Sequence, residues 1–316
     1  MSGDAGPHDP GDPADAAGVP DAADLAGVEV DIADGTLTWR QLLVETNRRL
    51  GDWTEARWLC QEASGLEGAD WVLGLEDRAT ERAVSRLDGM VARRLQGEPL
   101  QYVLGHWSFR TLDLLVDRRV LIPRPETEHL VEVALSIARA TTGPLTIADL
   151  GTGAGAIAMA LAAELFPRSL TVWATDASDD ALAVARANLA GMGRAAVAVR
   201  MEAGSWYDAL PPDLAGQLDL VVSNPPYIGT NEDLDESVRD WEPAAALLAG
   251  PHGLDALREV IAGAPRWLAA GGSLVCEIGA AQGPAVIALA EAAGLPAARV
   301  EPDLAGHDRI LVATKP

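Results

Sequence analysis

One four-residue turn, Asn224-Pro225-Pro226-Tyr227, constrains the fold more than any other feature of the chain. It follows the apolar run 218–223, which predicts a buried β-strand. Proline has no N–H to give to a sheet, so the two prolines cannot continue a central strand. The chain must therefore leave the sheet at its carboxyl end, where open α/β sheets bind ligands. An amide, bare carbonyls and an aromatic ring there suit a flat group that carries an NH2; a plain strand-ending turn is the alternative.

A glycine-rich segment follows an earlier predicted strand, 146–150. It leads into an alanine-rich helix predicted over 157–165. The residues of the segment are Gly151, Thr152, Gly153, Ala154 and Gly155. Glycines allow a tight turn and close approach of the backbone to a ligand, and the helix start offers unpaired N–H groups. The segment also fits the looser dinucleotide fingerprint, so it indicates an adenosine-type cofactor without deciding which one.

Asp176 ends the next predicted strand, 171–176, about one βαβ step after the glycines. Its carboxylate can accept hydrogen bonds from both hydroxyls of a ribose, in NAD or in S-adenosylmethionine. Alternatively, Asp176 or Ser178 caps the helix predicted over 179–189. The two roles are compatible with each other.

Strands and helices alternate through the rest of the chain. The predicted elements are a strand near 197–201, a strand at 272–278, a helix at 281–293, and two final strands at 298–302 and 308–314. This alternation predicts an α/β fold with a mostly parallel sheet that helices cover on both faces.

The segment 36–96 has helical spacing of its apolar residues and no glycine loop, which predicts a small helical bundle. Thr38 and Thr54 are predicted helix caps. Residues 97–122 are predicted to form an extended connector with a hairpin. The tryptophans of the bundle are expected in its core rather than against a ligand; they are Trp39, Trp53, Trp58 and Trp71.

The net charge of the chain indicates which classes of binding partner are disfavoured. The net charge is −23, and the first 35 residues carry nine acidic side chains and no Lys or Arg. This segment has too few large apolar residues to form a core, so 1–35 is predicted to be a disordered acidic tail. The remaining −14 disfavours sequence-independent binding of nucleic acid, which requires clustered cations.

Other classes of protein are disfavoured as well. We expect no membrane-spanning segment, because no uninterrupted apolar run approaches the length of a span. We expect no secretory signal, because the N-terminus lacks a basic region followed by an apolar stretch. Cys60 and Cys276 are far apart in the chain and are expected to be buried thiols in a reducing compartment. The five histidines are scattered, so no metal site is expected.

The order of these motifs resembles a class I S-adenosylmethionine-dependent methyltransferase that modifies planar nitrogens. Further segments resemble the peptide chain release factor N5-glutamine methyltransferase family, and the match runs from about Thr36 to the C-terminus. The segments are RRLQGEPLQY (93–102), GHWSF (105–109), LIPRPETE (121–128), Trp241-Glu242-Pro243 and DLAGHDR (303–309).

The resemblance implies a seven-stranded, mostly parallel Rossmann-like sheet closed by a terminal hairpin, with a small N-terminal helical domain. It implies that S-adenosyl-L-methionine donates a methyl group to N5 of the glutamine in the Gly-Gly-Gln motif of class-1 peptide chain release factors. The helical domain, 36–96, would dock the protein substrate, and 123–316 would be the methyltransferase domain. A cytoplasmic monomer without membrane or direct nucleic-acid contacts is expected.

The resemblance also implies roles for single residues. The loop 151–155 would wrap the methionine part of the cofactor, Asp176 would bind the ribose and Trp206 would lie beside the adenine. Asn224 would lie between cofactor and substrate. Ser205 stands where many relatives have an acidic residue, so it would bind the adenine amino group more weakly.

The chemistry expected of Asn224 to Tyr227 follows from the residues themselves. An amide nitrogen is a poor nucleophile, so the enzyme must mainly align it with the methyl group. The Asn224 side-chain oxygen and the Pro225 carbonyl can each accept one amide N–H and stabilise the charge that develops. Pro226 adds rigidity, and the Tyr227 ring can stack on the planar amide.

Three charged residues of the LIPRPETE segment also invite a catalytic interpretation as acid or base. A structural or cofactor-shielding role is the interpretation we favour, because prolines fix the backbone and the arginine can pair locally. These residues are Arg124, Glu126 and Glu128. Asp219, inside the strand that precedes Asn224, is also expected to be positional.

Three alternatives compete with this function. A methyltransferase of the same turn type could act on an exocyclic base nitrogen of DNA or RNA; the acidic charge disfavours this. A binding module with an idle Rossmann-like fold is disfavoured by the intact turn at Asn224. An NAD-dependent oxidoreductase is disfavoured because no His or Tyr-Lys pair is placed for hydride transfer.

Overall fold

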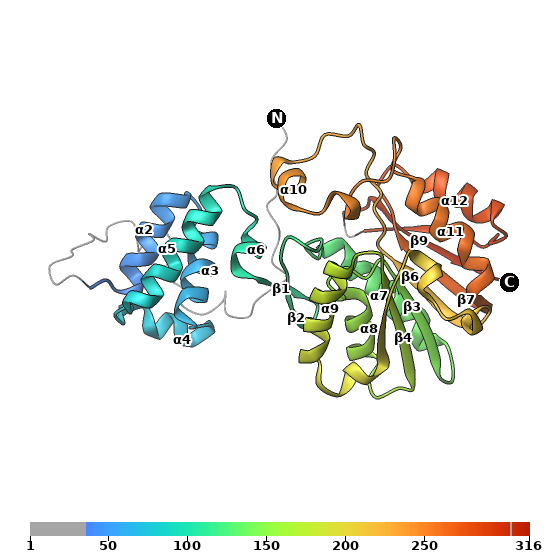
Figure 1. Cartoon of the computed structure of the whole chain (residues 1–316), viewed down its shortest axis with the longest axis horizontal. Coiled ribbons are helices and arrows are strands. Elements are labelled where there is room, and N and C mark those ends of the chain that lie inside the picture. The colour runs from blue at the N-terminus through green and yellow to red at the C-terminus, as the bar shows by residue number, and fades with distance from the viewer. Residues whose placement is uncertain (1–35, 304) are drawn as a thin grey trace. The chain divides into compact units, whose positions relative to one another are not determined.

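The computed structural model describes residues 36–303 and 305–316. The chain forms two compact units that divide between Leu104 and Gly105 (Figure 1). The acidic tail predicted at 1–35 lies outside the described residues.

The first unit is helical, as predicted. Its elements are α2 (Trp39–Leu50), α3 (Trp53–Ser64), α4 (Gly68–Leu73), η2 (Gly74–Glu76), α5 (Glu81–Leu95) and α6 (Leu100–Leu104). Trp39 and Trp71 are buried and meet edge to face, with ring centroids 6.3 Å apart. Trp53 and Trp58 are half-buried against the same core. The tryptophans therefore belong to the core of this unit, as the sequence predicts.

One of the two predicted helix caps is correct. Thr38 begins α2 with a reciprocal pair of hydrogen bonds, in which Thr38 and Gln41 each accept from the other's backbone N–H. The prediction for Thr54 is wrong. Asp52 caps α3 instead, because its Oδ1 accepts from the N–H groups of Thr54 and Glu55 at 2.8 and 3.0 Å. A carboxylate two residues earlier supplies the cap better than a hydroxyl inside the first turn.

A short helix stands where the sequence analysis expected extended chain. The helix is α6, and the Arg93 guanidinium donates to the carbonyls of Tyr102 and Val103 near its end, at 2.7 and 3.2 Å. The strands β1 (His106–Phe109) and β2 (Leu112–Leu115) follow and pair as an antiparallel hairpin. The hairpin belongs to the second unit.

The second unit contains a seven-stranded sheet. Its strands are β3 (Leu145–Leu150), β4 (Leu170–Asp176), β5 (Val199–Ala203), β6 (Leu218–Ser223), β7 (Leu268–Glu277), β8 (Arg299–Pro302) and β9 (Asp308–Thr314). The strand order is β5-β4-β3-β6-β7-β9-β8. Only β9 runs antiparallel to its neighbours. The predicted α/β class, the mostly parallel sheet and the terminal hairpin are confirmed.

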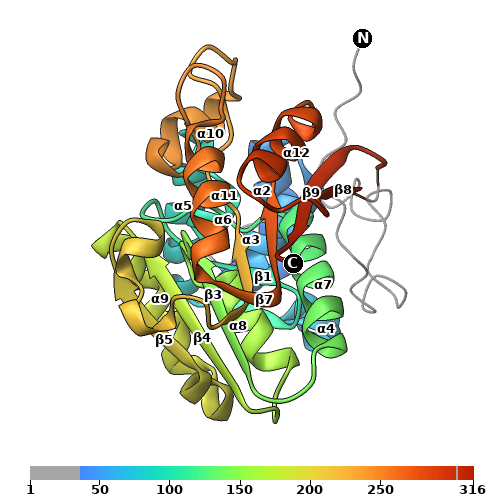
Figure 2. The same cartoon turned by 90° about the vertical axis from the view of Figure 1, so that its right-hand side faces the viewer.

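Helices cover both faces of this sheet (Figures 1 and 2). On one face lie α7 (Pro125–Ala140), α8 (Ala156–Glu164) and α9 (Asp179–Gly191), and on the other α11 (Asp255–Trp267) and α12 (Gly283–Ala292). Successive strand residues alternate between the faces, so that Ile147 packs against the first layer and Ala148 against the second. The shorter helical elements are η3 (Gly193–Ala198), η4 (Trp206–Ala209), η5 (Pro212–Leu214), α10 (Glu236–Trp241) and η6 (Ala244–Ala246).

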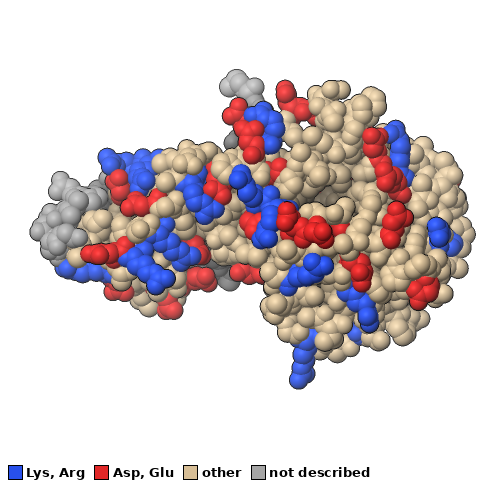
Figure 3. All heavy atoms as spheres, viewed as in Figure 1, with Lys and Arg blue, Asp and Glu red and all other residues tan. Residues whose placement is uncertain are grey.

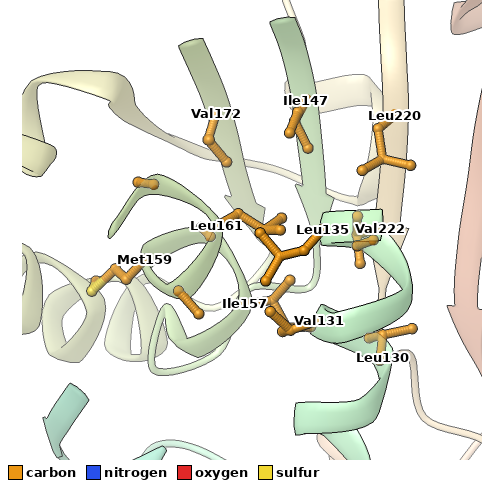
Figure 4. Close-up of a cluster of buried hydrophobic side chains, with 14 of the residues drawn as sticks. Leu130, Val131, Leu135, Ile147, Ile157, Met159, Leu161, Val172, Leu220 and Val222 are labelled. Carbon is orange, nitrogen blue, oxygen red and sulfur yellow. The ribbon is translucent and has the colours of Figure 1, made fainter. Parts of the chain in front are cut away.

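The first layer forms a dense apolar core (Figure 4). In it, α7 and α8 pack on the central strands, with side chains from α7, α8, β3, β4 and β6 meeting one another. The labelled members are Leu130, Val131, Leu135, Ile147, Ile157, Met159, Leu161, Val172, Leu220 and Val222. A parallel sheet buried on both faces requires such continuous apolar strands, so this core fixes the strand ends in place.

Both cysteines are free and buried, as predicted: Cys60 in the helical unit and Cys276 in β7. Within residues 36–303 and 305–316, no helix is long and apolar enough to cross a membrane. The same ranges contain no group of three or more His, Cys, Asp or Glu that could hold a metal ion.

Candidate functional site at the carboxyl edge of the sheet

The two sequence motifs meet at one place on the sheet. Strands β3 and β6 are parallel neighbours, with Leu150 opposite Ser223, and the Ser223 hydroxyl donates to the Leu150 carbonyl at 2.7 Å. After β3 the chain adds β4 and β5 on one side of β3, and then returns to add β6 on the other side. The direction in which strands are added therefore reverses between β3 and β6, which makes this the topological switch point of the sheet. The glycine loop and the turn at Asn224 therefore leave the sheet side by side.

Hydrogen bonds to the end of β4 fix the glycine loop. The N–H groups of Gly151 and Thr152 both donate to the Thr175 carbonyl at 2.9 Å. The Gly153 N–H donates to Asp176 Oδ2, also at 2.9 Å. The predicted cofactor residues of the glycine loop and of β4 are thus joined directly to one another.

Asp176 does not cap the next helix. Its Oδ1 accepts from the Ser178 N–H at 2.8 Å, and the Ser178 hydroxyl caps α9 by accepting from the Ala181 N–H. Of the two capping residues that the sequence left open, Ser178 is the one used. The Asp176 carboxylate stays at the strand end, beside the glycine loop.

The three glycines of the loop are glycine for two different reasons. A Cβ on Gly151 would lie 3.3 Å from the Trp206 ring, and one on Gly155 would lie 2.4 Å from the Met159 methyl carbon inside the packing of α8. A Cβ on Gly153 would meet no atom within 4 Å, although its φ of +56° favours glycine. Gly151 and Gly155 therefore allow close packing, while Gly153 borders open space that a ligand can occupy.

Two of the predicted cofactor residues, Thr152 and Ala154, form hydrogen bonds with other residues of the protein. The Thr152 hydroxyl donates to Asp149 Oδ2 at 2.6 Å, and its carbonyl accepts from the Gly155 N–H. The Ala154 carbonyl accepts from the Asn188 side chain at 2.9 Å. These hydrogen bonds fix the conformation of the glycine loop.

Asp149 is a site residue that the sequence analysis missed. Its side chain is fully buried, and Oδ2 accepts from the Thr152 hydroxyl and from the Ala158 N–H in the first turn of α8. Oδ1 has no partner among the described residues. Burial raises the pKa of Asp149 to about 7, with a smaller contribution from the charge of Asp176. An acid inside an otherwise apolar strand, just before the glycines, was the signal in the sequence.

A series of side-chain hydrogen bonds holds the turn at Asn224. Asn224 Nδ2 donates to Thr127 Oγ1 at 3.0 Å, and Thr127 Oγ1 donates to Glu277 Oε2 at 2.7 Å. The Tyr227 hydroxyl donates to the other oxygen of the same carboxylate, Oε1, at 3.0 Å. The sequence analysis named neither Thr127 nor Glu277 as a site residue.

Glu277 is buried at the last position of β7. Burial raises its pKa, while hydrogen bonds from Thr127 and Tyr227 and the charge of Arg309 act in the opposite direction. Burial and the adjacent carboxylate together raise the pKa of Tyr227 well above its usual range. The tyrosine therefore remains a neutral donor to Glu277.

Two acceptors of the turn are unused. Among the described residues, no hydrogen bond ends on Asn224 Oδ1 or on the Pro225 carbonyl. Asn224 is half-buried and Pro225 is buried. The turn therefore offers two fixed acceptors with capacity for an external donor.

A second clamp fixes the backbone of Tyr227. Gln282 Nε2 donates to the carbonyls of Tyr227 and Gly253 at 2.9 and 3.1 Å. The same side chain accepts from the Gly279 N–H through Oε1 at 2.9 Å. Gly253 approaches so closely that a Cβ there would lie 2.1 Å from the Tyr227 carbonyl oxygen. Neither Gln282 nor Gly253 was identified from the sequence.

Two of the three charged residues of the LIPRPETE segment make contacts within the protein. Arg124 pairs with the buried Glu242, whose Oε2 also accepts from the Ile122 N–H at 3.1 Å. Glu128 accepts from the Arg110 N–H at 2.9 Å. Glu126 is exposed.

Two further residues can be placed. Asp219 accepts from the Thr146 N–H at 2.8 Å and so joins β6 to β3. Ser205 is exposed just before Trp206, whose backbone has a φ of +46°.

The residues at this edge fit an adenosine-type cofactor that carries positive charge. Asp176 offers carboxylate oxygens for ribose hydroxyls, the Trp206 ring lies against Gly151 beside the loop, and Gly153 borders open space. Within the part of the chain that the structure describes, no ion pair joins Asp149 or Asp176 to an arginine. The Asp176 carboxylate, which lies at the strand end beside the loop, suits a cationic ligand.

Comparison with known proteins gives the following matches. A family model described as PrmC N-terminal domain matches residues 40–105, and one described as Methyltransferase small domain matches 134–241. The chain is 43% identical over 266 residues to the release factor glutamine methyltransferase of Cereibacter sphaeroides, covering 83% of this chain and 91% of that protein. It is 42% identical over 285 residues to that of Gloeobacter violaceus, covering 89% and 96%. The solved N-terminal domain of human METTL16 in complex with SAH is 16% identical, with a TM-score of 0.48, and the match covers 82% of this chain and 92% of that one.

The first prediction concerns the buried carboxyl of Asp149. Its pKa of about 7 in the folded state lies above the ordinary value of 3.8, so the native state holds this proton more tightly than the unfolded state. The stability that this proton contributes is full below about pH 4 and is lost as the pH rises to about 7. Asp149→Asn removes the titration.

The free energy of unfolding of Asp149→Asn, relative to the parent, should therefore rise by roughly 1.4 kcal/mol for each pH unit across that window. Denaturant unfolding at a series of pH values measures this difference. A difference that does not change with pH would contradict the assignment.

The second prediction concerns Gly253, whose φ is +66°. Gly253→Ala should destabilise the protein through backbone strain and through overlap with the Tyr227 carbonyl. Gly271→Ala is the matched control, because Gly271 has a φ of +79° and no atom within 4 Å of an added Cβ. We expect Gly253→Ala to lose roughly 2 kcal/mol more than the control in urea unfolding. Equal losses would show that the approach to Tyr227 is not a constraint.

Proposed function

Because this chain belongs to the release factor glutamine methyltransferase family, we propose that it methylates the side-chain amide nitrogen of a glutamine in a release factor. The acceptor atom is N5, and the glutamine is that of the Gly-Gly-Gln motif of a class-1 release factor. S-adenosyl-L-methionine is the cofactor; when bound, it supplies a methyl group on a positively charged sulfur that is already a good leaving group. The chain's own residues then have to hold the acceptor nitrogen in line.

One observation carries the proposal. Asn224 Oδ1 and the Pro225 carbonyl are fixed acceptors that receive no hydrogen bond from residues 36–303 or 305–316. They lie beside the glycine loop because Leu150 pairs with Ser223. A primary amide has two N–H groups on one nitrogen, so each acceptor takes one of them. This pairing orients the nitrogen and stabilises positive charge that develops on it during transfer.

The other residues of the turn have supporting roles. Pro226 has no N–H and a fixed φ, so it keeps the two acceptors in place. Glu277 holds the Tyr227 hydroxyl and Gln282 holds its backbone, so the ring is available as a rigid surface for the planar amide. No strong base is required, because the amide proton becomes acidic only after methyl transfer.

We assign the cofactor residues from the groups that the carboxyl edge of the sheet offers to an adenosine-type cofactor. Asp176 would accept from the ribose hydroxyls, Trp206 would stack on the adenine, and the loop around Gly153 would hold the methionine part. Asp149 would act through the loop, since its contacts are to Thr152 and Ala158. Exposed Ser205 would be a weak partner for the adenine amino group.

A nucleic-acid substrate is the alternative within the same chemistry, since a base amino group is also planar. On the face in Figure 3, Lys and Arg side chains are interspersed with Asp and Glu on each unit. Phosphate binding without sequence preference requires clustered cations. A protein substrate, a single subunit and a cytoplasmic location, where release factors act, remain our predictions.

A labelling experiment tests the function. The protein is incubated with labelled S-adenosylmethionine and, in separate reactions, with a class-1 release factor, with the same factor carrying Ala in place of its motif glutamine, and with nucleic acid. We expect label only on the unmodified release factor. Label on nucleic acid alone would reject the proposal.

Asn224→Ala separates catalysis from cofactor binding. Removing one of two fixed acceptors should lower kcat by about 100-fold or more, by analogy with the loss of a single group that stabilises the transition state. Affinity for S-adenosylhomocysteine, measured by calorimetry, should stay within a few-fold. The reciprocal variant, Asp176→Ala, should lose that affinity. Parental turnover in Asn224→Ala would disprove the role of the amide.

A further inference from the structure

We propose that Thr127 and Glu277 are positioning residues that fix which end of the Asn224 amide faces the substrate, and that they thereby make the site select glutamine over glutamate. This inference rests on the function proposed above. It assigns a role to two residues from distant parts of the chain, Thr127 in the first turn of α7 and Glu277 at the end of β7.

The direction of each hydrogen bond follows from its neighbour. The two oxygens of Glu277 accept from the Thr127 and Tyr227 hydroxyls, so Thr127 gives its single hydroxyl hydrogen to Glu277 Oε2. The Thr127 oxygen can then only accept from Asn224, and only the NH2 end of the amide can donate. Nδ2 is therefore held towards Thr127, and Oδ1 is left for the substrate.

Water has little access to the hydrogen bonds that join Asn224, Thr127 and Glu277. Thr127 is 4% exposed and Glu277 is 1% exposed, so water cannot readily replace either partner. The Tyr227 hydroxyl donates to the second oxygen of Glu277, so two donors fix the carboxylate. Both oxygens of this buried carboxylate therefore have donors, and a satisfied buried group holds one arrangement strongly.

This arrangement decides which side chain can bind. With Oδ1 outward, the site presents two acceptors, Asn224 Oδ1 and the Pro225 carbonyl, and both suit the NH2 of glutamine. A glutamate carboxylate would bring oxygen against oxygen at both positions. Sites built around hydrogen bonds reject a ligand that leaves their buried polar groups unpaired. A reversed Asn224 would present a donor and would lose this selectivity.

The test compares Thr127→Val with Thr127→Ser. Valine matches threonine in shape but cannot hold Nδ2, so Asn224 is free to turn; serine keeps the hydroxyl. Affinity is measured by calorimetry for a catalytically competent release factor and for the same factor with glutamate in place of its motif glutamine. Turnover is measured on the unmodified factor.

For Thr127→Val we expect the preference for glutamine over glutamate to shrink at least tenfold, with a fall in kcat of about tenfold. Thr127→Ser should restore both to within a few-fold of the parent. Thr46→Val is the matched control, since Thr46 is a buried threonine of the helical unit whose hydroxyl oxygen accepts from the Cys60 thiol. It should keep parental turnover and selectivity.

Several outcomes would overturn the inference. Parental selectivity in Thr127→Val would show that Asn224 keeps its orientation without the hydroxyl. Equal losses in Thr127→Ser and Thr127→Val, or a loss of turnover with unchanged selectivity, would show that Thr127 serves packing only. Failure of the parent itself to methylate the release factor would reject the proposed function rather than the positioning role.

Discussion

The pairing of β3 with β6 is the constraint on which the site depends. These two strands form the point where the direction of chain winding reverses, and Leu150 lies opposite Ser223 at their carboxyl ends. A slip of one residue in this register would turn every side chain of β6 to the other face of the sheet. Apolar layers cover both faces, so the register is strongly held, and with it the distance between the glycine loop and Asn224.

Two buried carboxylates organise the loops that this pairing brings together. Asp149 joins the glycine loop to the first turn of α8, and Glu277 joins α7 to the turn at Asn224 through Thr127 and Tyr227. Burying a carboxylate is unfavourable unless hydrogen bonds compensate it. Each carboxylate thus selects the one loop conformation that supplies its donors, which is how a rigid site forms from flexible connections.

Local sequence patterns predicted most of the fold and the positions of the motifs. Strand ends at Leu150 and Asp176, and the whole of β6, follow from apolar runs bounded by glycine, acid or proline. Asp149 was missed although its partners Thr152 and Ala158 are only 3 and 9 positions away. The other missed residues act over long separations, since Thr127 and Glu277 are 150 positions apart, and Gln282 meets Tyr227 across 55. No periodicity encodes such contacts. The Thr54 cap failed for a different reason, because two neighbouring polar residues competed and only the geometry of α3 chose Asp52.

The paired acceptors explain orientation but do not by themselves choose a protein substrate. Any planar NH2 group, on an amide or on a nucleobase, can give one hydrogen to Asn224 and one to Pro225. Discrimination between them must therefore come from what surrounds the pair, namely charge and shape. The net charge of −23 repels a polyanion that comes within a Debye length of the protein. A protein backbone carries no such charge and is not repelled in this way. In the function proposed here, the paired acceptors recognise an NH2 group and the net negative charge disfavours a polyanionic substrate.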